Sequence, residues 1–273
     1  MKKVKRILLM AISTAMIITF FLPLVMTVIC SFMNSAELAV VFGDEHPFRW
    51  IPYQVSVSGY FQVLFANETY LATFWNSMLI AIAAVALQVL SSLIVGYTLV
   101  RGKFRGRTAL FYLYMIVMLI PFQVTLLPTY ILAKDTGIYN TWLALVLPGG
   151  FAALGVFLMR QFILSFPDDI LEAARLDTDS NLRIIFEIVA PNVKGGLIAV
   201  AVLAFAENWN MIEQPLILLE NEWLYPLALK LHELPESQYA VRFAGSVLYM
   251  LPSILLFFLF ENELVDGAKH MKL

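Results

Sequence analysis

Cysteine, histidine and charged residues are all scarce in this sequence, and each scarcity excludes a class of function. The single cysteine, Cys30, lies inside an uncharged run, so the chain can form neither a disulfide framework nor a cysteine-based metal site. The three histidines are far apart and show no metal-ligand spacing, and no metal or other cofactor is expected. Charged residues make up 14% of the chain and the formal net charge is −2, so nucleic acid is not an expected partner.

A second absence concerns nucleotides. The pattern G-x-x-x-x-G-K-[ST] occurs nowhere in the sequence, and this pattern supplies the backbone amides and the lysine that hold the phosphates of ATP. The chain is therefore not expected to hold ATP in a phosphate-binding loop of this kind.

Apolar residues, in contrast, are abundant and gathered in long runs. Hydrophobic residues make up 60% of the chain, and the mean hydropathy is +0.79. A helix needs about 20 apolar residues to cross a membrane. Runs of about this length or longer, poor in charge, occur at 7–36, 71–100, 108–133, 136–159, 195–219 and 243–260. This pattern predicts an all-α polytopic membrane protein with six transmembrane helices.

The first run follows a short basic segment that contains Lys2, Lys3, Lys5 and Arg6. It is longer than the apolar region of a cleavable signal peptide, which has about 7–15 residues, so we expect an uncleaved transmembrane helix. The predicted division of the chain is a cytoplasmic N-terminus at 1–6, a first transmembrane helix at 7–32, an extracytoplasmic loop at 33–70, a transmembrane core at 71–262 and a cytoplasmic tail at 263–273.

Residues 165–191 (SFPDDILEAARLDTDSNLRIIFEIVAP) form the longest charge-dense segment of the chain. Apolar residues recur within it at helical spacing, and Ser165 with Asp168 has the form of a capping box. Residues 178–180 can end one helix and cap the next, and Pro191 marks the end of the second. We therefore predict two short helices that meet at a bend, a segment that we call the elbow. Its charges require water or a protein surface around it.

The elbow resembles the EAA loop of binding-protein-dependent ABC importer permeases. Glu172-Ala173-Ala174 is followed after two residues by Asp177, and Pro191 stands after an apolar stretch, as in the family pattern. Thr178 and Asp179 replace a glycine and an alanine of that pattern. The resemblance implies a coupling loop that docks on a cytoplasmic ABC ATPase; the alternative is a solvated loop with ordinary helix-face charges. The implied contact residues are Glu172, Ala173, Ala174, Arg175, Asp177 and Thr178.

Further motifs extend the resemblance over about residues 72–260. A turn at 101–107 has four cations and no acidic residue, and we interpret it as a topological anchor rather than a lipid or nucleic-acid site. The other matching pieces are Asn76-Ser77, residues 137–142, residues 157–162, and Trp209-Asn210 with Pro215. The resemblance implies a type I ABC importer permease fold with both termini cytoplasmic. Its pattern is most similar to the second permease of carbohydrate importers of the maltose and glycerol-phosphate type.

Polar residues interrupt the run at 195–219. A carboxylate in hydrocarbon costs at least about 2–3 kcal/mol, so such residues usually face the bundle interior or a watery cavity. The candidates for the translocation path are therefore Glu207, Asn208, Trp209 and Asn210. The alternative is that the span ends early and that these residues lie at the outer headgroups. Pro121 and Pro128 leave the run at 108–133 open to two readings, a kinked helix inside the bundle or a pathway-lining one.

The distribution of cations supports the six-span topology independently. Four of the 18 lysines and arginines fall in segments predicted to lie outside, namely Arg49, Lys134, Lys230 and Arg242. The other cations lie on the predicted cytoplasmic side together with the elbow, as the positive-inside rule requires. We therefore expect a multi-pass protein of the bacterial cytoplasmic (inner) membrane.

The resemblance, together with the topology, implies a permease subunit of a binding-protein-dependent ABC importer for a sugar or oligosaccharide. Such a subunit is expected to be non-catalytic, with ATP hydrolysis on a separate ATPase subunit. Its expected partners are a cytoplasmic ABC ATPase dimer, a sister permease in a heterodimer, an extracytoplasmic solute-binding protein and the lipid bilayer. The alternatives are a permease for another solute such as a polyamine, an ion-driven secondary transporter favoured by Glu207 and Glu213, and an integral-membrane enzyme. The lack of an obvious internal repeat argues against the second, and the scarcity of acidic residues in the runs argues against the third.

Overall fold

The computed structural model describes residues 2–43, 50–66, 68–235 and 237–270, and these residues form helices joined by turns, with no strand among them. The predicted all-α class is confirmed. The contacts divide the chain into two compact units. The first unit comprises residues 1–72 and 230–251, and the second comprises residues 73–229 and 252–273. The second unit contains the elbow and all the other candidate residues.

The first unit is built around the end of the N-terminal helix. Its elements are α1 (Lys2–Ser31), α2 (Ser35–Val41), α3 (Ser58–Phe61), the π-helix η1 (Gln62–Ala66), the start of α4, most of α14 and the first half of α15. A small core holds Cys30, Met33, Leu38, Val41 and Ala240. The apolar window of α1 is 0% buried. Its apolar surface is therefore available to lipid or to another protein.

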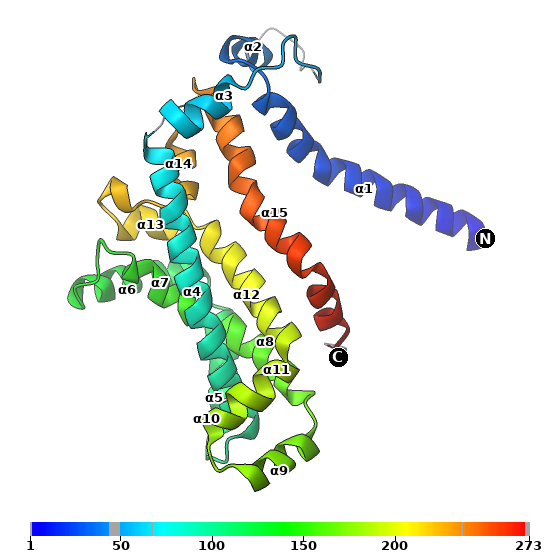
Figure 1. Cartoon of the computed structure of the whole chain (residues 1–273), viewed down its shortest axis with the longest axis vertical. Helices are drawn as coiled ribbons and strands as arrows, with labels where there is room; N and C mark the ends of the chain where they lie inside the picture. The colour runs from blue at the N-terminus through cyan, green and yellow to red at the C-terminus, as the bar shows by residue number, and fades with distance from the viewer. Residues whose placement is uncertain (1, 44–49, 67, 236, 271–273) are drawn as a thin grey trace. The chain divides into compact units, whose positions relative to one another are not determined.

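The second unit is a longer bundle of helices (Figure 1). Its elements are α4 (Glu68–Arg101), α5 (Arg107–Met118), α6 (Phe122–Asp135), α7 (Leu143–Gly150), α8 (Ala153–Leu164), α9 (Asp168–Asp177), α10 (Asn181–Arg183), the π-helix η2 (Ile184–Val189), α11 (Ala190–Asn192), α12 (Lys194–Trp209), α13 (Glu213–Leu218), the 3-10 helix η3 (Glu222–Leu224), the start of α14 (Leu227–Glu233) and the second half of α15 (Tyr239–His270).

Four helical stretches of the described chain are long and apolar enough to cross a membrane, or up to six if each of two bent pairs counts as one span. The four are Arg6–Ser31, Glu68–Arg101, Leu143–Leu164 and Tyr239–Glu263. The first bent pair joins α5 to α6 at 102°, and the second joins residues 181–192 to α12 at 85°. The run at 108–133 is thus bent more sharply than a kinked helix. Pro121 explains this bend, because the residue before a proline avoids helical backbone angles.

The span from α7 to α8 is also interrupted, and α4 satisfies the backbone at the break. The Gln88 side chain donates to the Ala152 carbonyl (2.8 Å) and accepts from the Ala152 amide (3.0 Å), while Ser91 Oγ donates to the Gly150 carbonyl (2.9 Å). A side chain at Gly155 would collide with the Gln88 amide, so glycine there permits the close approach of α8. Inside a membrane every freed backbone group needs such a partner.

Candidate coupling and translocation sites

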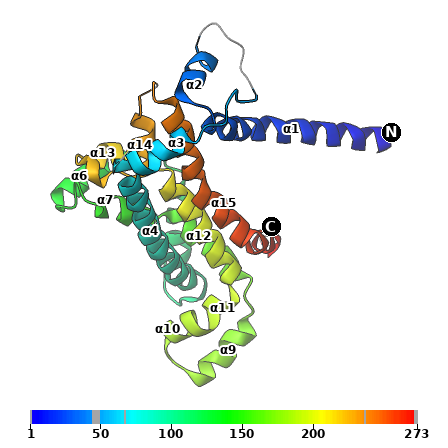
Figure 2. The same ribbon diagram turned by 45° about the horizontal axis from the view of Figure 1, so that its top comes forward.

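The elbow lies at the end of the second unit opposite α13, and both ribbon views place α9, α10 and α11 together there (Figures 1 and 2). The first helix, α9, begins after Pro167 and has Asp168 and Asp169 in its first turn. Negative charges at this end of a helix interact favourably with the helix dipole. The predicted capping box is wrong, since Pro167 is the N-cap and makes no side-chain cap bond. Ser165 instead follows α8, and its hydroxyl donates back to the Phe162 carbonyl (2.7 Å).

The bend between the two elbow helices has the predicted position. Ser180 caps the second helix by accepting a hydrogen bond from the Arg183 amide (3.3 Å), and Thr178 Oγ accepts from the Ser180 amide (3.2 Å). Thr178 has φ −154° and ψ 138°. This is extended backbone, which suits a β-branched residue, so the bend does not need a glycine at this position. Pro191 lies in the last turn, and the helical run ends at Asn192.

One face of the elbow is buried against the rest of the second unit. Leu171 and Ala174 of α9 and Ile184 and Ile185 of η2 belong to the same core. The other buried members come from α4, from α8 and the turn after it, and from residues 189–200, and they are Leu93, Tyr97, Met159, Phe162, Ile163, Phe166, Val189, Val193 and Val200. Burying apolar side chains contributes about 1.5–3 kcal/mol each. The elbow is therefore packed on the membrane helices as a structured part of the unit.

The opposite face of α9 is exposed and mixes apolar with charged residues. Among the residues expected to contact an ATPase, Glu172, Ala173, Arg175 and Asp177 are exposed. Ala174, by contrast, is 5% exposed and points into the core. Leu176 lies beside the charged residues and is 89% exposed, and no motif in the sequence points to it. Single exposed apolar residues are common on protein surfaces, so the exposure of Leu176 alone does not identify a contact surface.

Arg101, from the basic turn, fastens the elbow to the end of α4. Its guanidinium forms an ion pair with Asp168 and also donates to the Phe166 carbonyl (2.6 Å). The Arg101 side chain is 17% exposed and that of Asp168 is 69% exposed. The first turn of α9 is thus held at a fixed distance from α4. Nothing in the spacing of these residues, 67 positions apart, could have indicated the pair.

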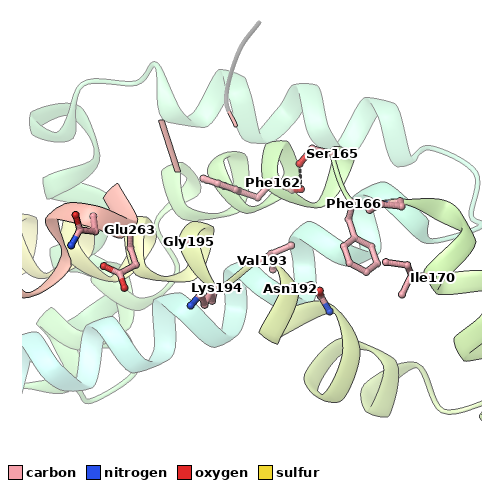
Figure 3. A pocket seen from close by; sticks show the side chains of 11 residues that line it. Phe162, Ser165, Phe166, Ile170, Asn192, Val193, Lys194, Gly195 and Glu263 are labelled. Atoms are coloured by element: carbon pink, nitrogen blue, oxygen red, sulfur yellow. Dashed lines mark hydrogen bonds between the residues drawn. The ribbon is translucent and has the colours of Figure 1, made fainter. Parts of the chain in front are cut away.

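A cavity of about 560 Å³ lies at the base of the elbow. Figure 3 shows its lining, which includes the apolar side chains of Phe162, Phe166, Ile170 and Val193. The polar side chains around it are Ser165, Asn192, Lys194, Asn262 and Glu263. Because these residues come from both sides of the bend between α11 and α12, a change of this bend would alter the cavity.

The four translocation candidates divide into two pairs at the end of α12. Asn208 and Trp209 are buried, and the Asn208 amide donates to the Ala204 carbonyl (2.8 Å). Glu207 and Asn210 are exposed. Asn210 is the C-cap residue of α12, so the helix ends here rather than at residue 219, and the predicted span over 195–219 is too long.

The packing around these candidates shows which of them are buried in the core and which are accessible. The Trp209 ring stacks on Phe205 (5.3 Å between centroids) and meets Phe74 edge-on (5.6 Å), so Trp209 is a core residue of the described structure. Glu207 lines a small cavity of about 10 Å³ together with Gln88, a space sufficient for about one water molecule. Glu207 is therefore the accessible carboxylate of this group.

The end of the second unit that carries α13 is held together by side chain to backbone bonds. Asn76 Nδ2 donates to the carbonyls of Trp223 (2.7 Å) and Tyr225 (3.1 Å), and Ser77 Oγ accepts from the Leu227 amide (2.7 Å). These bonds give the Asn76-Ser77 pair a structural role, fixing the segment after η3. The motif was visible in the sequence, but its partners were not.

Asn140 and Tyr139 hold the preceding loop at the same end. Asn140 has φ 59°, and its side chain accepts from the amides of Glu220 (2.9 Å) and Asn221 (3.0 Å). The Tyr139 hydroxyl donates to the Glu220 carboxylate (3.0 Å). Desolvation, and then this hydrogen bond, raise the pKa of Tyr139.

Comparison of the sequence with models of protein families shows the family of this chain. The family described as "Binding-protein-dependent transport system inner membrane component" matches residues 88–264. The chain belongs to this family. It is accordingly an inner membrane component of such a transport system, and the predicted resemblance and location are confirmed.

Individual relatives are permease proteins of transport systems for arabinooligosaccharides, lactose and sn-glycerol-3-phosphate. The arabinooligosaccharides transport system permease protein AraQ of Halalkalibacterium halodurans is 31% identical over 248 residues, which cover 90% of this chain and 88% of that protein. The lactose transport system permease protein LacG of Rhizobium radiobacter is 29% identical over 74% of this chain and 76% of its own. The sn-glycerol-3-phosphate transport system permease protein UgpE of Brucella melitensis is 25% identical over 92% and 91%. Permease subunits of ABC transporters are non-catalytic, in agreement with the missing nucleotide motif.

A solved structure shares the fold. It is that of a bacterial ABC transporter involved in the import of the acidic polysaccharide alginate, and its matching chain superimposes with a TM-score of 0.82. The sequence identity is 20%, and the match covers 95% of this chain and 96% of the other. The predicted ABC importer permease fold is confirmed.

Proposed function

We propose that this permease carries a sugar or an oligosaccharide and is driven by an ABC ATPase dimer that docks on the exposed face of the elbow. It would form one half of a heterodimer with a sister permease and receive its solute from an extracytoplasmic solute-binding protein. The AraQ and LacG relatives belong to transport systems for arabinooligosaccharides and lactose, which supports the solute class. Family membership supports the kind of partners.

One observation carries the coupling role: the elbow has a buried face and an exposed, mixed face. The buried residues of α9 and η2 pack in one core with α4 and α8, and Arg101 adds a polar connection. A push on the exposed side of α9 would therefore move the membrane helices with it. Small and apolar residues on that side, Ala173 and Leu176, allow a partner to approach closely, and Glu172 can form charge-assisted hydrogen bonds.

The docking face is tested by co-purification with the ATPase subunit of the same transport system. Glu172→Lys and Leu176→Ser should each reduce the ATPase recovered at least about tenfold, because loss of one partner at a buried interface contact costs about 2 kcal/mol or more. Asp135→Lys, which makes the same charge change at the exposed end of α6, should recover the normal amount. Full recovery with both elbow variants would refute docking at this face.

The solute class is tested with the reconstituted complex and its binding protein. The binding protein loaded with an oligosaccharide should stimulate ATP hydrolysis, whereas a polyamine should not. Stimulation by the polyamine alone would overturn the sugar proposal and leave the ATPase proposal intact. Uptake by the lone chain, driven by an ion gradient without ATPase, would instead establish the secondary transporter.

A further inference from the structure

The turn between α4 and α5 carries more positive charge than the second unit uses. It contains Arg101, Lys103, Arg105 and Arg107 and no acidic residue. Arg101 is committed to Asp168 and Phe166, and Arg107 donates to the carbonyls at the end of α4, on Val100 (2.8 Å) and Gly102 (3.1 Å). Lys103 and Arg105 are exposed, and neither has an ion pair within the described part of the chain. Two cations of the turn are therefore available to a ligand.

The free cations border a hollow of about 510 Å³. Its wall runs continuously from Gly102 to Ala109 and so includes Lys103, Arg105 and Arg107. Gly106 has φ +87° and contacts nothing that would stop a larger side chain, so it serves to turn the backbone around this space. The hollow is thus bounded by three cations and by the backbone that leads into α5.

A fourth cation stands on the neighbouring helix without an acidic partner. The Arg160 guanidinium of α8 lies 3.7 Å above the ring centroid of Phe111, a residue of α5. Its Nε is buried and has no hydrogen-bond partner among the described residues. Arg107 is its like-charged neighbour. Such a grouping of cations repels itself, so an anion between or beside them would stabilise it.

The apolar surface next to the hollow indicates which anion fits. α5 starts at Arg107 and is one arm of a candidate membrane span. Its side chains Leu110, Leu113 and Ile116 are exposed, as lipid-facing residues are. Phe104, between the two free cations, is also exposed, and aromatic residues are enriched at the membrane interface. A ligand with a negative head and apolar chains would match both surfaces at once.

We infer that the basic hollow at 102–109 binds the phosphate-bearing headgroup of an anionic phospholipid, whose acyl chains follow the exposed face of α5. Lys103 and Arg105 are the residues that contact the phosphate, and Phe104 marks the level of the headgroups. Basic hollows beside membrane helices commonly bind anionic headgroups. An acidic protein surface would match the charge but not the apolar side chains that continue along α5. The inference replaces the interpretation of this turn as a topological anchor alone, because the hollow and the two exposed cations appear only in the structure. It is independent of the solute carried.

The test measures lipid binding to the purified full-length permease complex in phosphatidylcholine nanodiscs. Phosphatidylglycerol is added as the probe, and its binding is compared between the wild-type protein and the variant that combines Lys103→Gln with Arg105→Gln. We expect the affinity to fall about tenfold or more, because each cation near the surface contributes about 1 kcal/mol to attraction for anionic lipid. Raising the salt concentration should weaken wild-type binding as well.

Two further variants separate a specific site from general attraction. The combination of Arg183→Gln with Lys194→Gln removes the same charge from exposed positions of the same unit and should keep near-wild-type affinity. The exchange of Lys103→Arg with Arg105→Lys keeps the charge and should retain binding, which excludes misfolding of the turn. An equal loss in both double glutamine variants would overturn the inference.

The same preparation distinguishes other anions and partners. Inorganic phosphate alone, at millimolar concentration, should fail to displace phosphatidylglycerol, and phosphatidylcholine binding should be equal in all variants. Displacement by phosphate would show a site for a soluble anion and refute the lipid. Unchanged lipid binding with a loss of the ATPase subunit in the Lys103/Arg105 variant would show an acidic protein surface as the occupant, and would equally refute it.

Discussion

Arg101 joins the basic turn to the elbow, and its two contacts differ in strength. Its partner Asp168 is 69% exposed, and an ion pair so close to water contributes only about 0–1 kcal/mol. The hydrogen bond to the Phe166 carbonyl comes from a largely buried guanidinium. Hydrogen bonds to charged groups contribute about 1.5–3 kcal/mol. The carbonyl contact is therefore the stronger connection.

This difference predicts unequal effects of removing the two sides of the pair. Arg101→Gln should lower the free energy of unfolding by about 1–3 kcal/mol, whereas Asp168→Asn should lower it by less than about 1 kcal/mol. Thermal unfolding of the purified protein in detergent measures both. Arg105→Gln, at a cation without a partner in the same turn, is the control and should leave stability unchanged. A larger loss for Asp168→Asn than for Arg101→Gln would contradict this assignment.

Thr178 stands where the family pattern has glycine, and the backbone explains why the exchange is tolerated. With φ −154°, Thr178→Gly gains no freedom that the fold needs and loses the acceptor for the Ser180 amide. We expect a loss of about 0.5–1 kcal/mol, because glycine has more conformational entropy to lose on folding. The matched variant is Gly106→Ala at φ +87°, where left-handed backbone costs about 1–2 kcal/mol. A stabilised Thr178→Gly protein would show that the bend is strained.

At the scale of elements, the break between α7 and α8 depends on one side chain of α4. Gln88→Leu keeps much of the volume but leaves the Ala152 amide and carbonyl without partners. Each unsatisfied buried group costs about 1–3 kcal/mol, so we expect a loss of about 2–6 kcal/mol, measured by thermal unfolding. Ser91→Ala removes one neutral bond to Gly150 and should cost about 0.5–1.5 kcal/mol. Equal effects of the two variants would refute the bracing role of Gln88.

Elements that depend on composition were predictable, and elements that depend on a distant partner were not. The helices α1 and α4 follow the apolar runs closely because about 20 apolar residues suffice to specify a span. The last helix, α15, continues to His270, ten residues beyond the run at 243–260. The elbow and its Ser180 cap were also visible, since both are local patterns. The break at Ala152 was not predicted, although Pro148, Gly149 and Gly150 stand just before it. Its partner Gln88 lies 64 positions away and no local pattern indicates that contact.

At the scale of the whole molecule, the candidate site also combines residues that a local motif could predict with residues that only long-range packing identifies. The exposed residues of α9 could be proposed from the motif, but only packing separates Ala174, which faces the core, from Ala173, which faces outward. Leu176 carries no motif, and its exposure appears only once the buried face of the elbow is known. Among the translocation candidates, likewise, only the packing at the end of α12 shows that Glu207 is exposed and Trp209 is buried.

The topology is the property on which the whole transport proposal depends, because an ATPase can reach the elbow only from the cytoplasm. The charge distribution predicts the elbow inside and the loop at η3 outside. Cys30 is the only cysteine and is buried, so single cysteines can be introduced and labelled against a low background. Asp179→Cys, at the exposed bend of the elbow, and Glu222→Cys, at the start of η3, are a suitable pair since both positions are exposed.

A membrane-impermeant maleimide gives the measurement. In intact cells with a permeabilised outer membrane, the cysteine at position 222 should react and the one at 179 should not, whereas in inside-out vesicles the reactivities should reverse. The unaltered chain, with Cys30 alone, is the control for background in both preparations. Labelling of position 179 from outside would place the elbow on the wrong side of the bilayer. A cytoplasmic ATPase could then not act through α9, even though the sequence of the elbow is similar to the family pattern.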